Sequence, residues 1–198
     1  METIRGKMSH TLDLTTLQAR LANYPSITLD LGTGDGKFAF CHADSFPERF
    51  VIGLDSCREN LREFSHAKLP NLLYVIASAQ NLPHELSGLV SHVTINFPWG
   101  SLLGSLLSGD PLLMRGLEST LKLGATLELR LNGGALAEAG WTLEDGMEQV
   151  RENLIRAGWK MNSPVTMDAH ALHTFPSTWA KRLAFGRDPR AIQVSACI

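Results

Sequence analysis

Short apolar runs that alternate with helical segments constrain the fold of this 198-residue chain more than any other feature. Five of them read ITLDLG, FVIGLD, LLYVIAS, SHVTINF and ATLELRL, and a sixth reads AIQVSACI. They cover residues 27–32, 50–55, 72–78, 91–97, 125–131 and 191–198. Strands separated by helices usually pair in parallel, with helices on both faces of the sheet. The sequence therefore predicts an α/β fold built on a parallel sheet.

Segments between these runs have the spacing of helices that pack on one side. Apolar residues recur at steps of three and four in 57–68 and 110–123, and Gly124 is the expected end of the second of these helices. A later helix is predicted in DGMEQVRENLIRAGW, with Asp145 as its N-cap and Gly158 as its C-cap.

Length and composition favour one domain over residues 1–198, with residues 1–25 as an N-terminal hairpin and helix. No linker rich in proline, serine or glycine divides it, and 44% hydrophobic with 19% charged residues is typical of a globular protein. With a formal net charge of −2, any nucleic-acid surface must be local. No apolar run approaches the roughly 20 residues of a membrane span. We therefore expect a cytoplasmic protein that does not bind membranes.

The cysteines and histidines do not have the pattern of a metal site. Cys41, Cys57 and Cys197 are odd in number and unevenly spaced, which disfavours a disulfide framework and a four-ligand zinc site. His170 and His173 have no cysteine or carboxylate cluster at ligand spacing. We therefore expect no metal.

A glycine loop, LDLGTGDGK, follows the first predicted strand and opens a helix. Glycines at 32, 34 and 36 allow a tight turn and the close approach of a ligand to the backbone. Lys37 stands where the dinucleotide fingerprint has its final glycine, and no Gly-Lys-Ser/Thr follows. These departures disfavour both NAD and a Walker-type phosphate site.

Two carboxylates indicate the ligand class more closely. Asp55 ends the second predicted strand, where a carboxylate can accept both hydroxyls of a ribose. Asp30 places negative charge beside the glycine loop, which suits a sulfonium or ammonium ligand better than a pyrophosphate. An ordinary strand–turn–helix corner with incidental glycines is the alternative at this point.

In its acid-x-G-x-G-x-G form, this loop resembles the first motif of class I S-adenosylmethionine-dependent methyltransferases. The resemblance implies a Rossmann-like, mostly parallel seven-stranded sheet with helices on both faces, and S-adenosylmethionine as cofactor. In such enzymes the turn after the third strand, here ASAQNLP with Gln80, holds the adenine of the donor. The loop after the fourth strand, here NFPWG, lies beside the sulfonium. Pro98 stiffens that loop, and Trp99 either offers a flat face to a planar acceptor or only fills the core.

Four cations surround Trp179 in TWAKRLAFGRDPR, against the single acid Asp188. They are Lys181, Arg182, Arg187 and Arg190. Stacking on an aromatic side chain is worth about 1–3 kcal/mol per base, and cations bind the flanking phosphates. Trp179 and Trp99 are therefore candidates for holding a nucleobase that has left its stack.

DLGTGDG, FPWG and STWAKRLAFGR, in this order, resemble the aminoglycoside-resistance methyltransferases that modify N1 of adenine 1408 in 16S rRNA. The resemblance covers the chain from about residue 27 to residue 198. It implies that the donor is held by Asp30, Gly32, Thr33, Gly34, Gly36, Asp55, Ser56, Ala79, Gln80, Asn96 and Ser101. It implies that Trp99 and Trp179 sandwich the flipped adenine, with Pro98 and Ser177 shaping their loops. The residues implied to contact rRNA are Lys181, Arg182, Arg187 and Arg190.

The reaction implied needs little acid–base equipment. Adenine N1 carries an in-plane lone pair, so alignment contributes most and no general base is expected. Glu128 is expected either to bind the substrate, to brace a loop or only to pack on its strand. None of the three cysteines lies in the loop after the fourth strand, where it could serve as nucleophile, which disfavours a cytosine C5 methylase.

The expected partner is the 30S subunit with its 16S rRNA, bound by a monomer without a protein partner. Only three cations lie in 56–71, and 132–148 contains four acids and no lysine or arginine, so RNA binding should be weak and less sensitive to salt. One alternative is a tRNA (guanine-N7) methyltransferase, whose loop after the fourth strand usually continues Asp-Pro-Trp. The other is a catalytically weak or silent RNA-binding relative.

Overall fold

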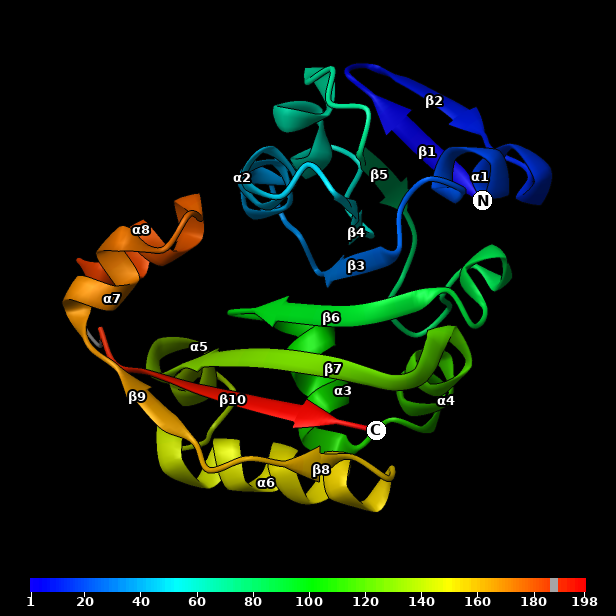
Figure 1. Ribbon diagram of the computed structural model, residues 1–198. Coiled ribbons are helices and arrows are strands. Elements are labelled where there is room, and N and C mark those ends of the chain that lie inside the picture. The colour runs from blue at the N-terminus through cyan, green and yellow to red at the C-terminus, as the bar shows by residue number, and fades with distance from the viewer. Residues whose placement is uncertain (186–188) are drawn as a thin grey trace.

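The computed structural model describes residues 1–185 and 189–198, and these form a mixed ten-stranded sheet with helices on both faces (Figure 1). The strand order is β2-β1-β5-β4-β3-β6-β7-β10-β8, with β9 paired to β10. The strands are β1 (Glu2–Arg5), β2 (Met8–Thr11), β3 (Ser26–Leu31), β4 (Arg49–Asp55), β5 (Leu72–Ile76), β6 (Val90–Asn96), β7 (Leu121–Asn132), β8 (Lys160–Met161), β9 (Val165–Met167) and β10 (Ala191–Cys197). The helices are α1 (Leu14–Leu21), α2 (Lys37–Ser45), α3 (Gly100–Ser108), α4 (Pro111–Thr120), α5 (Gly133–Glu138), α6 (Leu143–Arg156), α7 (Ala169–Thr174) and α8 (Thr178–Ala184). Single 3-10 turns are η1 (Asn60–Arg62), η2 (Phe64–His66) and η3 (His84–Leu86).

The parallel part of the sheet confirms the predicted fold class. Strands β5, β4, β3, β6 and β7 pair in parallel, and β10 is antiparallel to β7. With β8, these strands correspond to the seven that the resemblance implied, while the β1–β2 hairpin and β9 extend the sheet. The strand order reverses between β3 and β6, and in open α/β sheets ligands bind in the crevice at the carboxyl ends of strands at such a point.

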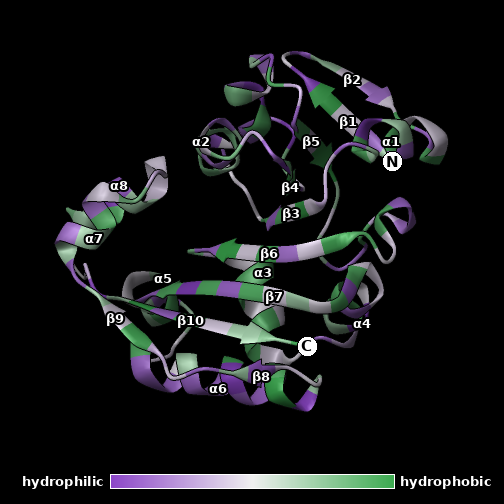
Figure 2. Ribbon diagram, in the orientation of Figure 1, coloured by the Kyte–Doolittle hydropathy of each residue, from purple (hydrophilic) through white to green (hydrophobic). Residues whose placement is uncertain are grey.

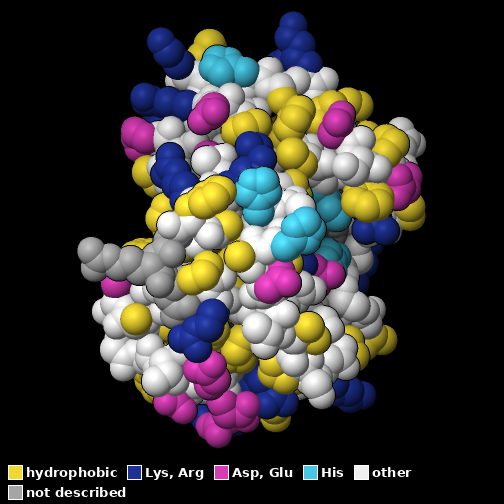
Figure 3. All heavy atoms as spheres, turned by 90° about the vertical axis from the view of Figure 1, so that its left-hand side faces the viewer, with side chains coloured by type: hydrophobic (Ala, Val, Ile, Leu, Met, Phe, Trp, Pro, Cys, Tyr) yellow, Lys and Arg dark blue, Asp and Glu magenta, His cyan; other side chains and the backbone are white. Residues whose placement is uncertain are grey.

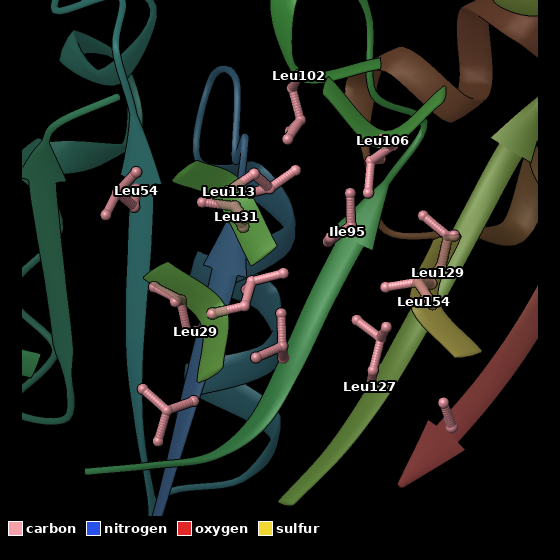
Figure 4. Packing of buried hydrophobic residues seen from close by; sticks show 14 of the residues in the cluster. Leu29, Leu31, Leu54, Ile95, Leu102, Leu106, Leu113, Leu127, Leu129 and Leu154 are labelled. Carbon is pink, nitrogen blue, oxygen red and sulfur yellow. The ribbon is translucent and has the colours of Figure 1, made fainter. Parts of the chain in front are cut away.

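Leucine and isoleucine side chains fill the layer between the sheet and α3, α4 and α6 (Figure 4). On the opposite face α2, η1 and η2 pack on a smaller apolar cluster. Each fully buried aliphatic side chain stabilises the fold by about 1.5–3 kcal/mol. Successive residues of a strand face opposite sides of the sheet. Because the leucines of β3 lie in the larger cluster, Asp30 between them faces α2.

Polar residues on the α2 face of β6 and β7 alternate with these core residues. Figure 2 shows hydrophobic and hydrophilic residues alternating along β7 where it leads to α5. Thr94 and Asn96 of β6 lie opposite Glu128 and Arg130 of β7 in the register. The sheet thereby gathers polar groups beside the carboxyl end of β3.

The helix predicted over 57–68 is wrong, because this segment forms only η1 and η2. The Ser65 hydroxyl accepts from the backbone N–H of Gly6 at 2.9 Å and donates to the carbonyl of Arg62 at 3.3 Å. A serine hydroxyl that donates to a backbone carbonyl in this way competes with the hydrogen bonds of a helix for that carbonyl. Docking against the β1–β2 hairpin therefore decides the local structure.

Gly124 does not end a helix, contrary to prediction. Helix α4 ends at Thr120, whose buried hydroxyl donates to the carbonyl of Leu117 at 2.8 Å, and β7 begins at the next residue. Leu121 is buried and pairs with Val90, so tertiary pairing ends the helix early and leaves Gly124 inside the strand.

Asp145 is not the N-cap of α6, as predicted, because Thr142 has that position. The Thr142 hydroxyl caps the helix by accepting from the Asp145 N–H at 3.0 Å, and it donates to the Asp145 carboxylate at 2.8 Å. Gly158, with a φ of +95°, directly follows the C-cap Ala157, close to its predicted place.

No helix in the described part of the chain is long and apolar enough to cross a membrane.

Candidate active site

The glycine loop crosses from β3 to α2 with its backbone facing a cavity of about 1050 Å³. The N–H groups of Gly32 and Thr33 both donate to the carbonyl of Leu54, at 2.8 and 3.0 Å, which fixes the loop to β4. Gly36 has a φ of +82°, and a Cβ there would lie 2.5 Å from Tyr74. Gly34 has a φ of +60° with open space where a Cβ would be, so a ligand can approach its backbone.

Asp55 links the glycine loop to the end of β4. One of its carboxylate oxygens accepts from the N–H of Gly34 at 2.9 Å, and the other accepts from the N–H of Cys57 at 2.8 Å. Burial raises the pKa of Asp55 above its usual value, although these two N–H donors act against the increase. A carboxylate offers about four acceptor positions, so two remain for hydroxyl groups of a ligand in the cavity.

Asp30 is 1% exposed and lies at the inner end of the cavity. Its carboxylate accepts from the Thr94 hydroxyl at 2.8 Å and from the Asn96 amide at 3.0 Å. Burial raises the pKa of Asp30 to about 6, and the donors around it and the charge of Arg130 limit the increase. A positive charge in the cavity would favour the ionised form.

Arg130 connects this carboxylate site to the α7–α8 segment, and sequence reasoning missed it. Its guanidinium donates to the Asn96 side-chain oxygen at 2.8 Å, to Gln193 at 3.2 Å and to Glu128. It also lies over the ring of Phe175, 4.8 Å from the centroid. The one sequence signal was the alternation of polar with apolar residues in LELRLN. Glu128 braces this network through its ion pair with Arg130.

Arg130→Met should lower the free energy of unfolding by about 1–3 kcal/mol, because methionine keeps the apolar contact but leaves two partly buried side-chain oxygens without this donor. For a chain of this size the melting temperature falls by about 2–4 °C per kcal/mol. Urea unfolding of both proteins measures the effect. Arg156→Met, which breaks an exposed ion pair with Glu152, is the control. Equal losses in the two variants would contradict a stabilising role for the Arg130 network.

Phe175 anchors the α7–α8 segment to the carboxyl end of the sheet. Its ring stacks on Phe38 with centroids 5.3 Å apart and meets Phe97 edge to face at 5.4 Å. Aromatic pairs of this kind add about 0.5–1.5 kcal/mol each beyond the area they bury. Phe97 has a φ of +53°, rare for a bulky residue, and this left-handed turn directs the following Pro98 and Trp99 toward the cavity.

Trp99 and Trp179 meet at the cavity mouth, although 79 residues separate them in the sequence. Their ring centroids lie 5.5 Å apart at an interplanar angle of 87°, and the residues are 41% and 37% exposed. Trp99 is therefore not core filler. The Ser177 hydroxyl caps α8 by accepting from the Ala180 N–H, which sets the helix that carries Trp179.

The other predicted donor-site residues also face this cavity, except Gly36, which does not line it. Those that do are Gly32, Thr33, Gly34, Ser56, Ala79, Gln80, Asn96 and Ser101, together with Asp30 and Asp55. Residues from η1 and η2 complete the wall without having been predicted, as does Phe38.

Residues 2–198 match the family model described as NpmA: 16S rRNA (adenine(1408)-N(1))-methyltransferase. The chain belongs to this family. It is a methyltransferase that uses S-adenosylmethionine. The match extends over the whole described cavity, including the glycine loop and both tryptophans.

Curated relatives and solved structures agree with the family match. The 16S rRNA (adenine(1408)-N(1))-methyltransferase of Streptoalloteichus tenebrarius is 30% identical over 204 residues, which cover 95% of this chain and 94% of the relative. The crystal structure of the 16S rRNA methyltransferase KamB superposes with a TM-score of 0.89 at 30% identity, covering 100% of this chain and 99% of KamB. A tryptophan-to-alanine variant of the Catenulisporales acidiphilia 16S rRNA (adenine(1408)-N(1))-methyltransferase with cosubstrate SAM has a TM-score of 0.85 at 26% identity, covering 100% and 96%.

The cavity of this methyltransferase fits S-adenosylmethionine. The positive-φ glycine loop leaves its backbone open to a ligand, and Asp55 retains acceptor capacity beside it. Asp30 supplies a carboxylate at the inner end, where a cationic ligand is favoured. The site therefore offers acceptors for ribose hydroxyls and a counter-charge for the cation.

Charge is unevenly distributed over the face that carries α7 and α8. Lys and Arg side chains lie mainly in the upper half of this face, and acidic side chains gather at its lower edge (Figure 3). Lys181 and Arg182 are exposed on α8, and Arg182 also lines the cavity. Arg190 forms an exposed ion pair with Glu144 at 3.3 Å. Arg187, predicted to contact rRNA, lies outside the described residues.

Among the described residues, no three His, Cys, Asp or Glu side chains come together in a group that could hold a metal ion.

Proposed function

We propose that Trp99 and Trp179 hold adenine 1408 of 16S rRNA next to bound S-adenosylmethionine, so that the chain methylates N1 of this base and confers aminoglycoside resistance. The observation that carries the proposal is the pair of exposed indoles that line the same cavity as Asp30 and Asp55. The enzyme acts on the 30S subunit as a cytoplasmic monomer of one domain.

The chain's own residues position the reactants. S-adenosylmethionine supplies a methyl group, which moves to the lone pair of adenine N1 while the bond from carbon to sulfur breaks and its electron pair stays on sulfur. Asp55 would accept from the ribose hydroxyls of bound donor, the glycine loop would offer its backbone to it, and Asp30 would supply a counter-charge for its cation. Alignment of two reactants in this way can remove several kcal/mol from the barrier, so the site works without a general base.

The two indoles must separate before a base can enter. At 5.5 Å and 87° the edge of one ring contacts the face of the other, which leaves no space for a third ring between them. Trp179 stands on α8, a helix of seven residues, whereas Trp99 follows the buried Phe97–Pro98 turn. We assign the movement to Trp179, which closes on the flipped adenine after the rRNA binds.

The test of this function is to incubate the protein and S-adenosylmethionine with 30S subunits, free 16S rRNA and bulk tRNA. Nucleoside mass spectrometry identifies the product, and reverse transcription locates it because a methyl group on N1 blocks base pairing. We expect 1-methyladenosine at position 1408 in 30S subunits. 7-Methylguanosine in tRNA alone would establish the guanine-N7 alternative, and a failure to bind S-adenosylmethionine would indicate an RNA-binding relative without activity.

The affinity for S-adenosylmethionine should fall as the pH decreases through about 6, because the pKa of Asp30 is about 6 and only its ionised form attracts the cationic donor. The decrease is at most about tenfold per pH unit for one titrating group. Calorimetric titration between pH 5 and pH 8 measures it. Asp30→Asn removes this titration, so a variant with the same pH profile as the wild type would rule out Asp30 as the responsible group.

A further inference from the structure

We infer that Ser105 and Asp110 fix the side-chain amide of Gln80 in one orientation and thereby make the donor site selective for a 6-aminopurine. The inference rests on the proposed donor site. Neither Ser105 nor Asp110 lines the cavity, so both act through Gln80 and are positioning residues.

The hydrogen bonds that fix Gln80 start at Asp110, the N-cap residue of α4. One oxygen of the Asp110 carboxylate caps the helix by accepting from the Leu112 N–H at 2.9 Å. The other oxygen accepts from the Ser105 hydroxyl at 3.1 Å. A carboxylate has no hydrogen to donate, so the single hydrogen of the Ser105 hydroxyl must point toward Asp110.

Ser105 can then only accept from Gln80. Its hydroxyl oxygen lies 2.7 Å from the Gln80 side-chain nitrogen, and with its hydrogen committed to Asp110 it would repel the amide oxygen. Ser105 is 7% exposed, so water has little access to replace either partner. The donor–acceptor order along Asp110, Ser105 and Gln80 therefore determines which end of the amide faces which way.

The Gln80 amide oxygen is left facing Ser78, and both residues line the cavity. The Ser78 hydroxyl donates to this oxygen and accepts from the Gln80 backbone N–H at 3.2 Å. A hydroxyl can also accept from an amide nitrogen, so Ser78 tolerates both orientations, whereas Ser105 tolerates one. An amide oxygen has a second lone pair, which can accept from an exocyclic amine.

This arrangement discriminates between purines at position 6. The amine of adenine can donate to the Gln80 oxygen, but the carbonyl of hypoxanthine would place two acceptors against each other. A buried acceptor without a partner costs about 1–3 kcal/mol, which corresponds to a preference of about 5- to 150-fold. If the amide could rotate, its N–H group would face the carbonyl and the preference would be lost.

The experiment is a calorimetric comparison of S-adenosylhomocysteine with S-inosylhomocysteine, which differ at purine position 6. The wild type should bind the adenine compound at least about fivefold more tightly. Ser105→Ala removes the acceptor that fixes the amide. Asp110→Asn retains a helix cap but can donate, which frees the Ser105 hydrogen. In both variants the preference should decrease to within about threefold, mainly through tighter binding of the inosine compound.

Ser108→Ala is the matched control, because Ser108 lies on the same helix as Ser105 and its hydroxyl donates to the Ser105 backbone carbonyl, not to the Ser105 side chain. It should keep the wild-type preference. If the two variants weaken both compounds equally, Ser105 and Asp110 have only a structural role and the inference is wrong. If the wild type binds neither compound, the proposed donor site itself is wrong, which is a separate outcome.

Discussion

Trp179→Ala should lower the rate of methyl transfer by about 100-fold while the affinity for S-adenosylmethionine stays within about twofold. Stacking contributes about 1–3 kcal/mol per base, and loss of the larger value corresponds to a reduction of about 150-fold. Trp179 is exposed on α8, whereas Asp55 and the glycine loop line the cavity at the carboxyl ends of β4 and β3. We therefore expect the rate of methyl transfer to fall while the donor affinity stays nearly unchanged. Single-turnover methylation of 30S subunits and calorimetric titration of the donor provide them.

Two further variants make this prediction specific. Trp179→Phe keeps a stacking face and should recover a large part of the rate. Phe185 is another aromatic residue close to the end of the same helix, is 79% exposed and does not line the cavity. Phe185→Ala should therefore retain most of the activity. Unchanged turnover in Trp179→Ala would show that this indole only packs against Trp99.

Asp55→Ala should weaken the binding of S-adenosylmethionine by about 10- to 150-fold, the range expected for the loss of hydrogen bonds to a charged group worth about 1.5–3 kcal/mol. The carboxylate has two functions that the substitution removes together. It accepts from the N–H groups of Gly34 and Cys57, and it is the acceptor proposed for the ribose. Calorimetric titration measures the change.

Asp44→Ala controls for the loss of one negative charge, because Asp44 is exposed on α2 and does not line the cavity. Its donor affinity should match the wild type. Asp55→Asn keeps one acceptor oxygen and should lie between the wild type and Asp55→Ala. Unaltered donor affinity in Asp55→Ala would show that the ribose binds elsewhere.

The local sequence pattern was sufficient to locate the part of the site at the ends of β3 and β4. The glycine loop, Asp30 and Asp55 lie at strand ends that can be read from single apolar runs, and parallel pairing brings strand ends to one edge. The loop with Pro98 and Trp99 follows a strand in the same way. These predictions needed only the order of strands and helices along the chain.

Pattern failed where a distant partner decided the local structure. Residues 57–68 have apolar residues at helical spacing, yet the N–H of Gly6 in the β1–β2 hairpin donates to the Ser65 hydroxyl and no α-helix forms. Gly124 follows the helical pattern where a C-cap glycine is expected, yet Leu121 pairs with β6, so β7 begins three residues before it. In both cases a contact with a residue at least 30 positions away offset the local preference, which no window of neighbouring residues contains.

By itself, the sequence determined the α/β class, the glycine loop after the first parallel strand and the identity of the two exposed tryptophans. Only the tertiary structure decided that Trp179 reaches Trp99, through the packing of Phe175 on Phe38, Phe97 and Arg130. It also decided the orientation of Gln80, through Ser105 and Asp110. The physical reason is that periodicity and turn chemistry act between near neighbours, whereas aromatic packing and hydrogen-bond direction depend on groups that meet only after the sheet has formed.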